Sequence, residues 1–496
     1  MAHEGLAQLA AVLGAVGAAL VLLPLRGRAA LFGGFALLAV AEGALAVVLV
    51  PQHDLERLSS PVALAGLTFG IALVAGLAVL LAFRPALVPL AVLAAAPFRI
   101  PVDLGTQRAF LLLPLYAVLA AAALALLAQA LRGPVREGLP RPVALACAAP
   151  LALLAVSLLW AEDPHQGAIE LGFFVFPFAV LLAVVARAPF AEWLPRGLAT
   201  LLVGLSSVFA LIGLWQARTH RLFFAHDLDV ANAYTTFFRV TSVFKDPSLY
   251  GRYLVFALVV LLVAVTLRLV SIWVAAGLTA LLWTGLYFSY SQSSMFTLFV
   301  MTVAIVLVAG ERRQKRAVMA ACLVFAIAAG GAFALTARDH SSRKYTSGRS
   351  RLVAVTLPVI EHRPLWGVGV GSQPYASQRL AAKNLSVSRN ASHTTPLTVA
   401  AELGAIGVAA YAALLAAAAW LLLALTRRDR ALGLGLAAVF ATIVLHSLFY
   451  SGFFEDPVTW GVIAVAAAAL TRPQPADAAD RREPATEPEL VPAPGT

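Results

Sequence analysis

The hydrophobic positions of this chain form long unbroken runs separated by short polar stretches. Most runs approach the roughly 20 apolar residues that a helix needs to cross a bilayer, and two are only about 14 residues long, at 85–98 and 458–471. Because the runs are continuous rather than alternating, a membrane β-barrel is excluded. The pattern predicts an all-α, polytopic integral membrane protein with about 12–15 transmembrane helices. The runs lie near 5–25, 29–50, 61–83, 85–98, 109–131, 142–160, 168–186, 197–215, 251–267, 270–288, 294–310, 317–336, 396–425, 431–449 and 458–471.

Composition agrees with this pattern. Hydrophobic types make up 61% of the 496 residues and charged types 12%, about half the roughly 25% of soluble domains. There is too little polar sequence to cover a soluble domain, and nothing indicates a disordered, collagen-like or disulfide-rich protein. Cys147 and Cys322 lie in apolar runs and form no metal motif. The N-terminus lacks a basic region and a cleavage site, so it reads as the first span rather than a signal peptide.

The net charge of +11 reads first as cytoplasmic loop charge. The short basic connections are 26–28, 132–141, 311–316 and 427–430. Placing them inside leaves 51–60, 99–108, 161–167, 216–250, 289–293, 337–395 and 450–457 outside. We therefore predict a membrane domain over 1–471 with long extracytoplasmic loops at 216–250 and 337–395, the second being the large one. A Pro-, Ala- and Glu-rich tail, 472–496, is expected to be disordered and cytoplasmic. Charged residues are expected to avoid the span centres.

The outer loop 337–395 is itself strongly basic. Such a loop can be solvated and translocated regardless of its charge. Alternatively, clustered guanidinium groups can hold an anion, because the planar fork of arginine makes two parallel bonds to phosphate. The basic residues are Arg338, Arg343, Lys344, Arg349, Arg351, Arg363, Arg379, Lys383 and Arg389.

A second basic cluster closes the loop 216–250. Arg239, Lys245 and Arg252 flank the pair Asp246-Pro247, which favours a turn followed by a helix start. Three cations at the start of a helix suit an anion-binding site. They suit equally well an anchor of basic and aromatic residues at the membrane interface.

Four further polar clusters fall in the predicted outer segments: Ser289–Ser294, Arg363–Gly371, Ser392–Gly407 and His446–Pro457. Each has a plain structural interpretation, respectively a hairpin turn, a tight glycine turn, a structural histidine and a surface turn with aromatic anchors. The topology was derived from the cytoplasmic charges alone, and it still places every cluster on one side of the membrane. This agreement indicates an extracytoplasmic active site.

The order of these motifs resembles the O-antigen ligase and O-antigen polymerase superfamily. The resemblance covers about 235–410. It is carried by Arg239, Phe244-Lys-Asp-Pro-Ser-Leu-Tyr-Gly251, the serine-rich turn, Arg363-Pro-Leu-Trp-Gly-Val-Gly369, Ser392-His393 and Glu402-Leu-Gly-Ala-Ile-Gly407. It implies a large helical glycosyltransferase fold of the GT-C type in the bacterial inner membrane. The implied activity moves a glycan from an undecaprenyl-pyrophosphate carrier onto a glycan or lipid-core acceptor at the periplasmic face, with inversion, without metal or cofactor and without a nucleic-acid partner.

The resemblance also implies residue roles. Arg239 is expected to bind pyrophosphate, His393 to act as general base, and Arg349 or Arg351 to be the loop arginine. The sequence departs from the family pattern at Ser248, Gln292 and Thr394. The family arginine at the position of Gln292 is missing, and Lys245 or Arg252 could supply its phosphate contact.

The residues suit such chemistry. Pyrophosphate is already an activated leaving group, so the protein has to neutralise its charge and orient the acceptor. A histidine near neutral pKa can take the hydroxyl proton, with Asp246 and Glu402 as alternative bases. A ligase and a polysaccharide polymerase both fit. A lipid-linked sugar transporter would need charges along a midplane path and repeat symmetry, neither of which is found, and a scaffold would not explain the one-sided clusters.

Overall fold

The computed structural model describes residues 2–25, 27–50, 60–104, 107–336, 349–380, 392 and 394–471. Helices account for nearly all of its regular structure. They are α1 (Ala2–Leu22), α2 (Arg28–Leu49), α4 (Pro61–Phe83), η1 (Pro85–Leu87), α5 (Val88–Ala95), α6 (Leu113–Arg132), α7 (Arg141–Ser157), η2 (Leu158–Trp160), α8 (Pro164–Glu170), η3 (Leu171–Val175), α9 (Phe176–Ala186), α10 (Leu194–Thr219), α11 (His226–Ala233), α12 (Pro247–Thr266), α13 (Ile272–Ser289), α14 (Gln292–Ala309), α15 (Arg312–Thr336), α17 (Arg349–His362), α18 (Gln373–Leu380), α19 (Thr395–Arg428), α20 (Arg430–Ser447) and α21 (Pro457–Leu470), with strands β1 (Ile100–Leu104) and β2 (Gln107–Leu111).

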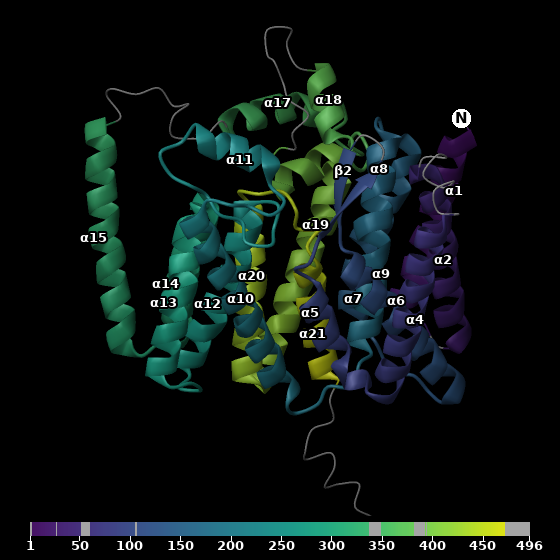
Figure 1. Cartoon of the computed structure of the whole chain (residues 1–496), viewed down its shortest axis with the longest axis horizontal. Coiled ribbons are helices and arrows are strands. Elements are labelled where there is room, and N and C mark those ends of the chain that lie inside the picture. The colour runs from purple at the N-terminus through teal and green to yellow at the C-terminus, as the bar shows by residue number, and fades with distance from the viewer. Residues whose placement is uncertain are drawn as a thin grey trace, which may run out of the picture.

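Most of the long helices run side by side and form one bundle (Figure 1). Twelve helices among the described residues are long and apolar enough to cross a membrane. This confirms an all-α, multi-pass membrane protein within the predicted range of spans. The two weak runs form shorter apolar helices, at Pro85–Ala95 and Pro457–Leu470.

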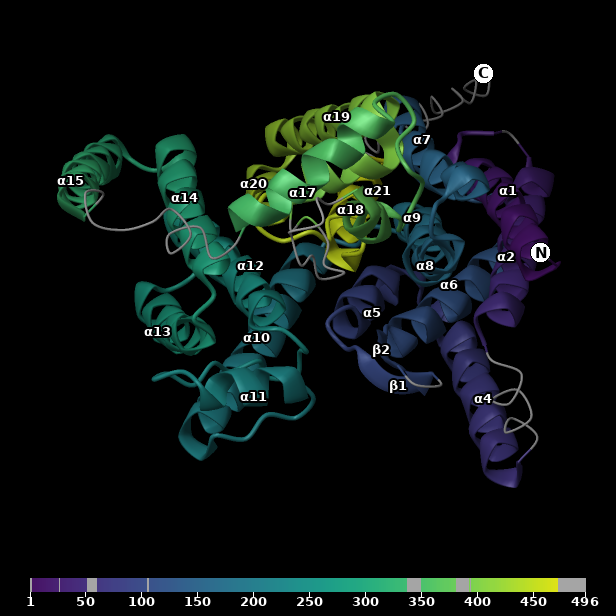
Figure 2. The ribbon, with the colours of Figure 1, turned by 90° about the horizontal axis from the view of Figure 1, so that it is seen from above.

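Burial separates central from peripheral helices. In α12, 72% of the span is buried inside the protein, whereas the figure for α4 is 6%. Because α4 is apolar on all sides, it suits contact with lipid rather than with other helices. Seen from above, α4 and α15 project from opposite parts of the bundle, and α12 lies between α10, α13, α14 and α20 (Figure 2).

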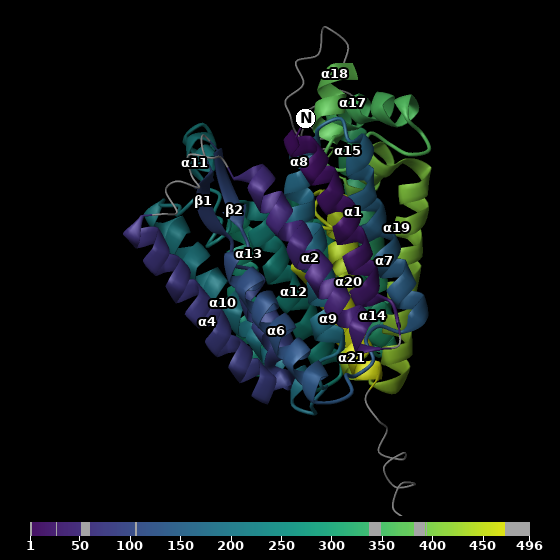
Figure 3. The ribbon, with the colours of Figure 1, turned by 90° about the vertical axis from the view of Figure 1, so that its right-hand side faces the viewer.

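The two ends of the bundle differ. The helices α11, α17 and α18 and the strands lie at one end, while α21 ends at the other (Figures 1 and 3). The described elements of the long loops 216–250 and 337–395 therefore share the end opposite the last residue of α21. This arrangement agrees with the predicted alternation of loops. The side of the membrane that each end faces stays a prediction.

Two local expectations need correction. The predicted outer connection 99–108 contains strands that the hydrophobic pattern did not indicate: β1 and β2 form an antiparallel hairpin in which Ile100 pairs with Leu111 and Leu104 with Gln107. The strands are only five residues long, too short to show a clear alternation. Charged residues also do not uniformly avoid the span centres, since Glu42 lies within α2.

A π-helical segment interrupts one predicted span. The run 168–186 forms α8, then the π-helix η3, then α9. The wider turn is held by Tyr116, whose hydroxyl donates to the carbonyl oxygen of Phe173 at 2.7 Å. Such π-bulges are frequent at functional sites. This one lies directly after Glu170.

Candidate active site

The start of α12 follows the predicted Asp-Pro signal. Asp246 is the N-cap and its Oδ1 accepts hydrogen bonds from the backbone N–H groups of Ser248 (2.6 Å) and Leu249 (3.4 Å). Pro247 occupies the first helical position, where its missing N–H leaves no bond unmade. One role of the Asp246 carboxylate, an alternative base in the sequence interpretation, is therefore to cap this helix.

Arg239 is tied to the elements on both sides of it. Its backbone N–H and C=O bond to the side chain of Asn232 in α11, both at 3.1 Å. Its Nε donates to the carbonyl oxygen of Ser289 at 3.4 Å. Partial burial lowers the pKa of the guanidinium, and the charge of Asp246 opposes that shift. A guanidinium has five donors, so this bond to Ser289 leaves donors with which Arg239 can contact an anion.

The serine-rich turn is a tight link between α13 and α14, as predicted. Tyr290 has a left-handed backbone (φ 48°), and Ser291 caps α14 by accepting from the N–H of Ser294. The sequence did not reveal its partner. His446 of α20 lies with Nε2 3.4 Å from Ser293 Oγ and 3.3 Å from Ser294 Oγ. Two of the clusters, far apart in the sequence, therefore meet inside the protein.

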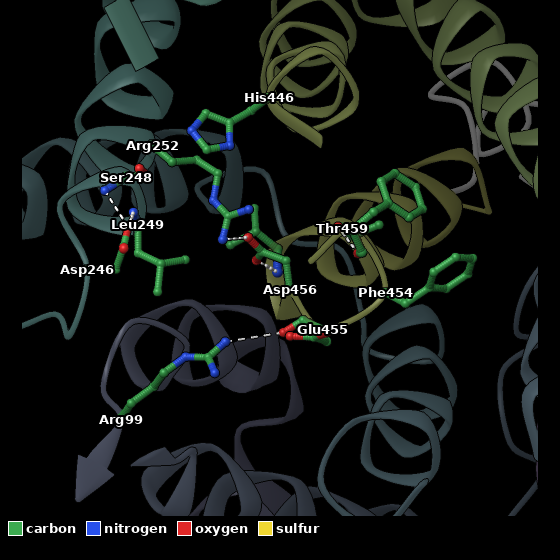
Figure 4. A network of polar contacts seen from close by, with 12 residues as sticks. Arg99, Asp246, Ser248, Leu249, Arg252, His446, Phe454, Glu455, Asp456 and Thr459 are labelled. Atoms are coloured by element: carbon green, nitrogen blue, oxygen red, sulfur yellow. Dashed lines mark hydrogen bonds and ion pairs between the residues drawn. The ribbon is translucent and has the colours of Figure 1, made fainter. Parts of the chain in front are cut away.

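Arg252 forms a buried ion pair with Asp456 (Figure 4). Nη2 of Arg252 lies 2.8 Å from Oδ2 of Asp456, and each side chain is 2% exposed. Asp456 also caps α21 by accepting from the N–H of Val458 at 2.8 Å. The guanidinium of Arg252 lies 6.0 Å from the ring centre of Tyr450. Arg252, expected as a possible phosphate ligand, thus pairs one of its nitrogens with a carboxylate, and its role at the phosphate stays a prediction.

Sequence reasoning missed Arg99, which precedes the hairpin. Its Nη2 donates to the carbonyl oxygen of Glu455 at 3.3 Å (Figure 4), and its guanidinium lies 5.8 Å from the ring centre of Phe174. Burial and the charge of Arg99 lower the pKa of Lys245, whereas Glu455 and Asp246 act in the opposite direction. Arg99 and Lys245 therefore lie close enough to repel each other. The only sequence signal was an arginine in a short outer loop.

The glycine turn brings backbone close to its neighbours, as predicted. Gly367, Gly369 and Gly371 all have positive φ, at 69°, 92° and 71°. A Cβ on Gly367 would lie 2.2 Å from the carbonyl group of Glu402, and one on Gly369 2.4 Å from Ala161. No side chain fits at either position, so this turn packs directly against α19 and the connection between η2 and α8.

The helix α19 opens to receive that turn. Gly404 has a non-helical backbone (φ 62°, ψ −159°). Two N–H groups near this break bond across to the turn, Ala405 to Pro364 O at 2.8 Å and Ile406 to Leu365 O at 3.4 Å. The motif Glu402–Gly407 is therefore the docking point of the glycine turn. It also places the Glu402 side chain, whose Oε1 accepts from the N–H of Gln373 at 3.2 Å.

A cavity of about 510 Å³ lies beside this junction. Side chains from α8, η3, α18, α19 and the α20–α21 connection line it, and they include Glu402, the second alternative base. The polar lining residues are Asp163, Gln166, Glu170, Gln373, Tyr375, Thr395, Thr398, Glu402, Ser451 and Glu455.

His393, the expected general base, lies outside the described residues. The residues on either side are described, and Ser392 is fixed by hydrogen bonds from its N–H to Gln373 Oε1 (3.2 Å) and between its Oγ and Thr398 Oγ1 (2.7 Å). Gln373 and Thr398 both line the cavity. Arg349 and Arg351 begin α17, but their side chains are outside the described part. The roles expected for these three residues stay predictions.

Residues 277–412 match the family model described as O-antigen ligase. The matched segment includes the serine turn, the glycine turn and the Glu402–Gly407 motif, whereas Arg239 lies before it. None of the curated proteins gives a significant match to the chain. The family match confirms the resemblance to the O-antigen ligase and polymerase superfamily. With the multi-pass helical fold, it supports a membrane glycosyltransferase of the O-antigen ligase or polymerase kind.

Proposed function

We propose that this protein is an inverting, metal-independent glycosyltransferase of the O-antigen ligase kind. It moves a glycan from an undecaprenyl-pyrophosphate carrier onto an acceptor hydroxyl at the periplasmic face of the bacterial inner membrane. The observation that carries the proposal is the position of Arg239, whose guanidinium bonds to the carbonyl oxygen of Ser289 inside the segment that matches the family model.

In the proposed reaction the acceptor oxygen attacks the anomeric carbon from the face opposite the pyrophosphate. The bond between that carbon and the pyrophosphate oxygen breaks, and undecaprenyl pyrophosphate leaves with the bonding electrons. The basic side chains, Arg239 first among them, stabilise the negative charge that grows on the leaving group. His393 takes the proton of the acceptor hydroxyl.

Metal independence follows from the role of the arginines. They neutralise the pyrophosphate charge, as a metal cation does in other phosphate chemistry. The described residues contain no cluster of three or more His, Cys, Asp or Glu side chains suited to a metal. The prediction is that purified protein transfers glycan at full rate in the presence of a chelator.

The deciding experiment is transfer from a lipid-linked glycan in vesicles containing the purified protein, with and without a lipid-core acceptor. Discharge of the carrier into the core acceptor supports the ligase. Growth of the lipid-linked glycan without that acceptor indicates a polymerase instead. Absence of both products, or loss of wild-type transfer in chelator, contradicts the proposal.

His393→Ala is the matching test of the base. Removing a positioned base typically lowers a rate about 10²–10⁴-fold, so this variant should bind donor but hardly transfer it. His393→Gln should not restore the rate, because an amide cannot accept and release the proton. In the wild type, transfer should fall as the pH drops below the pKa of the base. An unperturbed histidine has a pKa of about 6.5, and nearby arginines would lower this midpoint. A near-wild-type rate in His393→Ala would make Glu402 and Asp246 the remaining candidates for the base.

A further inference from the structure

The cavity beside the glycine turn differs in charge from the basic cluster near α12. Its lining includes the carboxylates of Asp163, Glu170, Glu402 and Glu455, and no Lys, Arg or His occurs among the described residues that line it. Because no cation is among these lining residues, a pyrophosphate or another anion would lose its hydration there without gaining a counter-charge. The bond from Arg99 to the backbone of Glu455 joins the basic cluster to the edge of this acidic cavity (Figure 4).

Buried polar groups in the wall lack partners that a ligand could supply. Thr395 is 3% exposed, lines the cavity, and its Oγ1 has no hydrogen-bond partner among the described residues. Buried hydroxyls are normally bonded, so an unpaired one in a cavity wall points to a missing polar ligand. Glu402 is 5% exposed and lines the same cavity. A carboxylate has several acceptor positions, so Glu402 can accept more than the bond from Gln373.

Aromatic rings form another part of the wall, contributed by Phe174, Tyr375, Phe453 and Phe454. The volume of about 510 Å³ lies within the roughly 300–1,000 Å³ typical of small-ligand sites. Carboxylates that accept hydroxyl hydrogens, combined with aromatic rings that cover an apolar face, suit a sugar ring. The carboxylates favour a ligand that is neutral or carries an amine.

We propose that this cavity binds the acceptor's sugar unit through Thr395, Glu402 and Glu170, and that it selects uncharged or amine-bearing sugars against those carrying a carboxylate or phosphate. The identification of the bound sugar as the acceptor rests on the proposed function. The charge preference does not depend on it. Donor pyrophosphate and acceptor sugar then occupy separate sites, and the carrier's phosphates find no cation among the lining residues of the acceptor site.

The test uses three methyl glycosides that share one ring, namely methyl glucoside, methyl glucosaminide and methyl glucuronide. Their binding to full-length protein in nanodiscs is measured by saturation-transfer NMR, without donor. The glucoside and the glucosaminide should bind, and the glucuronide at least about tenfold more weakly, because its carboxylate would be desolvated among lining residues that include no cation to pair with it. Equal binding of the glucuronide, or no saturable binding of any glycoside, overturns the proposal.

Two conservative variants locate the binding. Thr395→Val keeps the side-chain shape and should weaken glucoside binding about five- to tenfold, as expected for one lost hydrogen bond. Glu402→Gln should weaken glucosaminide binding relative to glucoside binding, because an amide cannot form an ion pair with the sugar's ammonium group. Glu162→Gln is the matched control, because Glu162 pairs with Arg379 at 2.8 Å and does not line the cavity. It should leave glycoside binding unchanged. Variants are compared only when their size-exclusion profiles and melting temperatures match the wild type.

The transfer assay separates this proposal from the proposed function. If glycosides bind as expected but the lipid-linked donor is never discharged, the cavity assignment stands and the transferase assignment falls. If transfer occurs and Thr395→Val changes neither the acceptor KM nor glycoside binding, the acceptor lies elsewhere and the cavity proposal is wrong.

Discussion

At the residue scale, Arg239 is the side chain on which donor binding is expected to depend most. It is half-buried, fixed by Asn232 and the carbonyl of Ser289, and still has donors for an anion. Arg239→Ala should abolish transfer while the protein remains folded in the membrane. Arg239→Lys should recover only part of the activity, because an ammonium cannot make the bidentate contact.

The measurement is transfer together with binding of the labelled carrier. Arg268→Ala is the control, since Arg268 is an exposed arginine whose pair with Glu311 lies in the basic connections opposite the proposed site. Full activity in Arg239→Ala would remove this residue from the active site.

The pair Arg252–Asp456 makes a different prediction, about stability. Both side chains are 2% exposed, and removing one partner of a buried pair typically costs about 3–5 kcal/mol because it leaves an uncompensated charge. Arg252→Met should therefore lower the melting temperature markedly. Adding Asp456→Asn should restore much of it, since asparagine is neutral and still caps α21.

A double-mutant cycle measured by thermal unfolding in detergent checks this expectation. Additive effects of the two substitutions would show that the pair does not couple α12 to α21. In that case Arg252 becomes available again as the phosphate ligand that the sequence suggested.

At the scale of elements, the break in α19 is expected to control the shape of the cavity. Gly404 has positive φ, and a Cβ there would lie 2.3 Å from the backbone of Leu365. Gly404→Ala should therefore displace the glycine turn, lower the melting temperature and weaken glycoside binding. The strain of a non-glycine residue at such a position is roughly 1–3 kcal/mol before the clash is added.

Gly461→Ala in α21 is the matched control, because no atom lies within 4 Å of a Cβ built there. Alanine is the better helix former, so this variant should be as stable as the wild type or slightly more stable. Equal behaviour of the two variants would mean that the turn does not depend on the opening at Gly404.

At the scale of the whole molecule, the long apolar runs predicted the helices well, because a bilayer-spanning helix satisfies its own backbone hydrogen bonds and needs little else. The start of α12 was also predictable, because the cap Asp246 and the first helical residue Pro247 act on neighbouring backbone groups. The contacts between distant segments were not predictable. Nothing in the spacing of His446, Ser293 and Ser294, or of Arg252 and Asp456, shows that helix packing brings them together. Arg99 escaped notice because a lone arginine carries no pattern.

The orientation of the molecule is the largest untested expectation. The end that bears α11, α17 and α18 should face outward, since short basic connections favour the cytoplasm. With Cys147 and Cys322 replaced by alanine, a cysteine at 380, the last residue of α18, should react with a membrane-impermeant reagent in spheroplasts. A cysteine at 485, in the tail, should not react. In inverted vesicles the pattern should reverse. Labelling of 485 but not 380 in spheroplasts would place the basic cluster and the acidic cavity in the cytoplasm, where the proposed periplasmic transfer cannot occur.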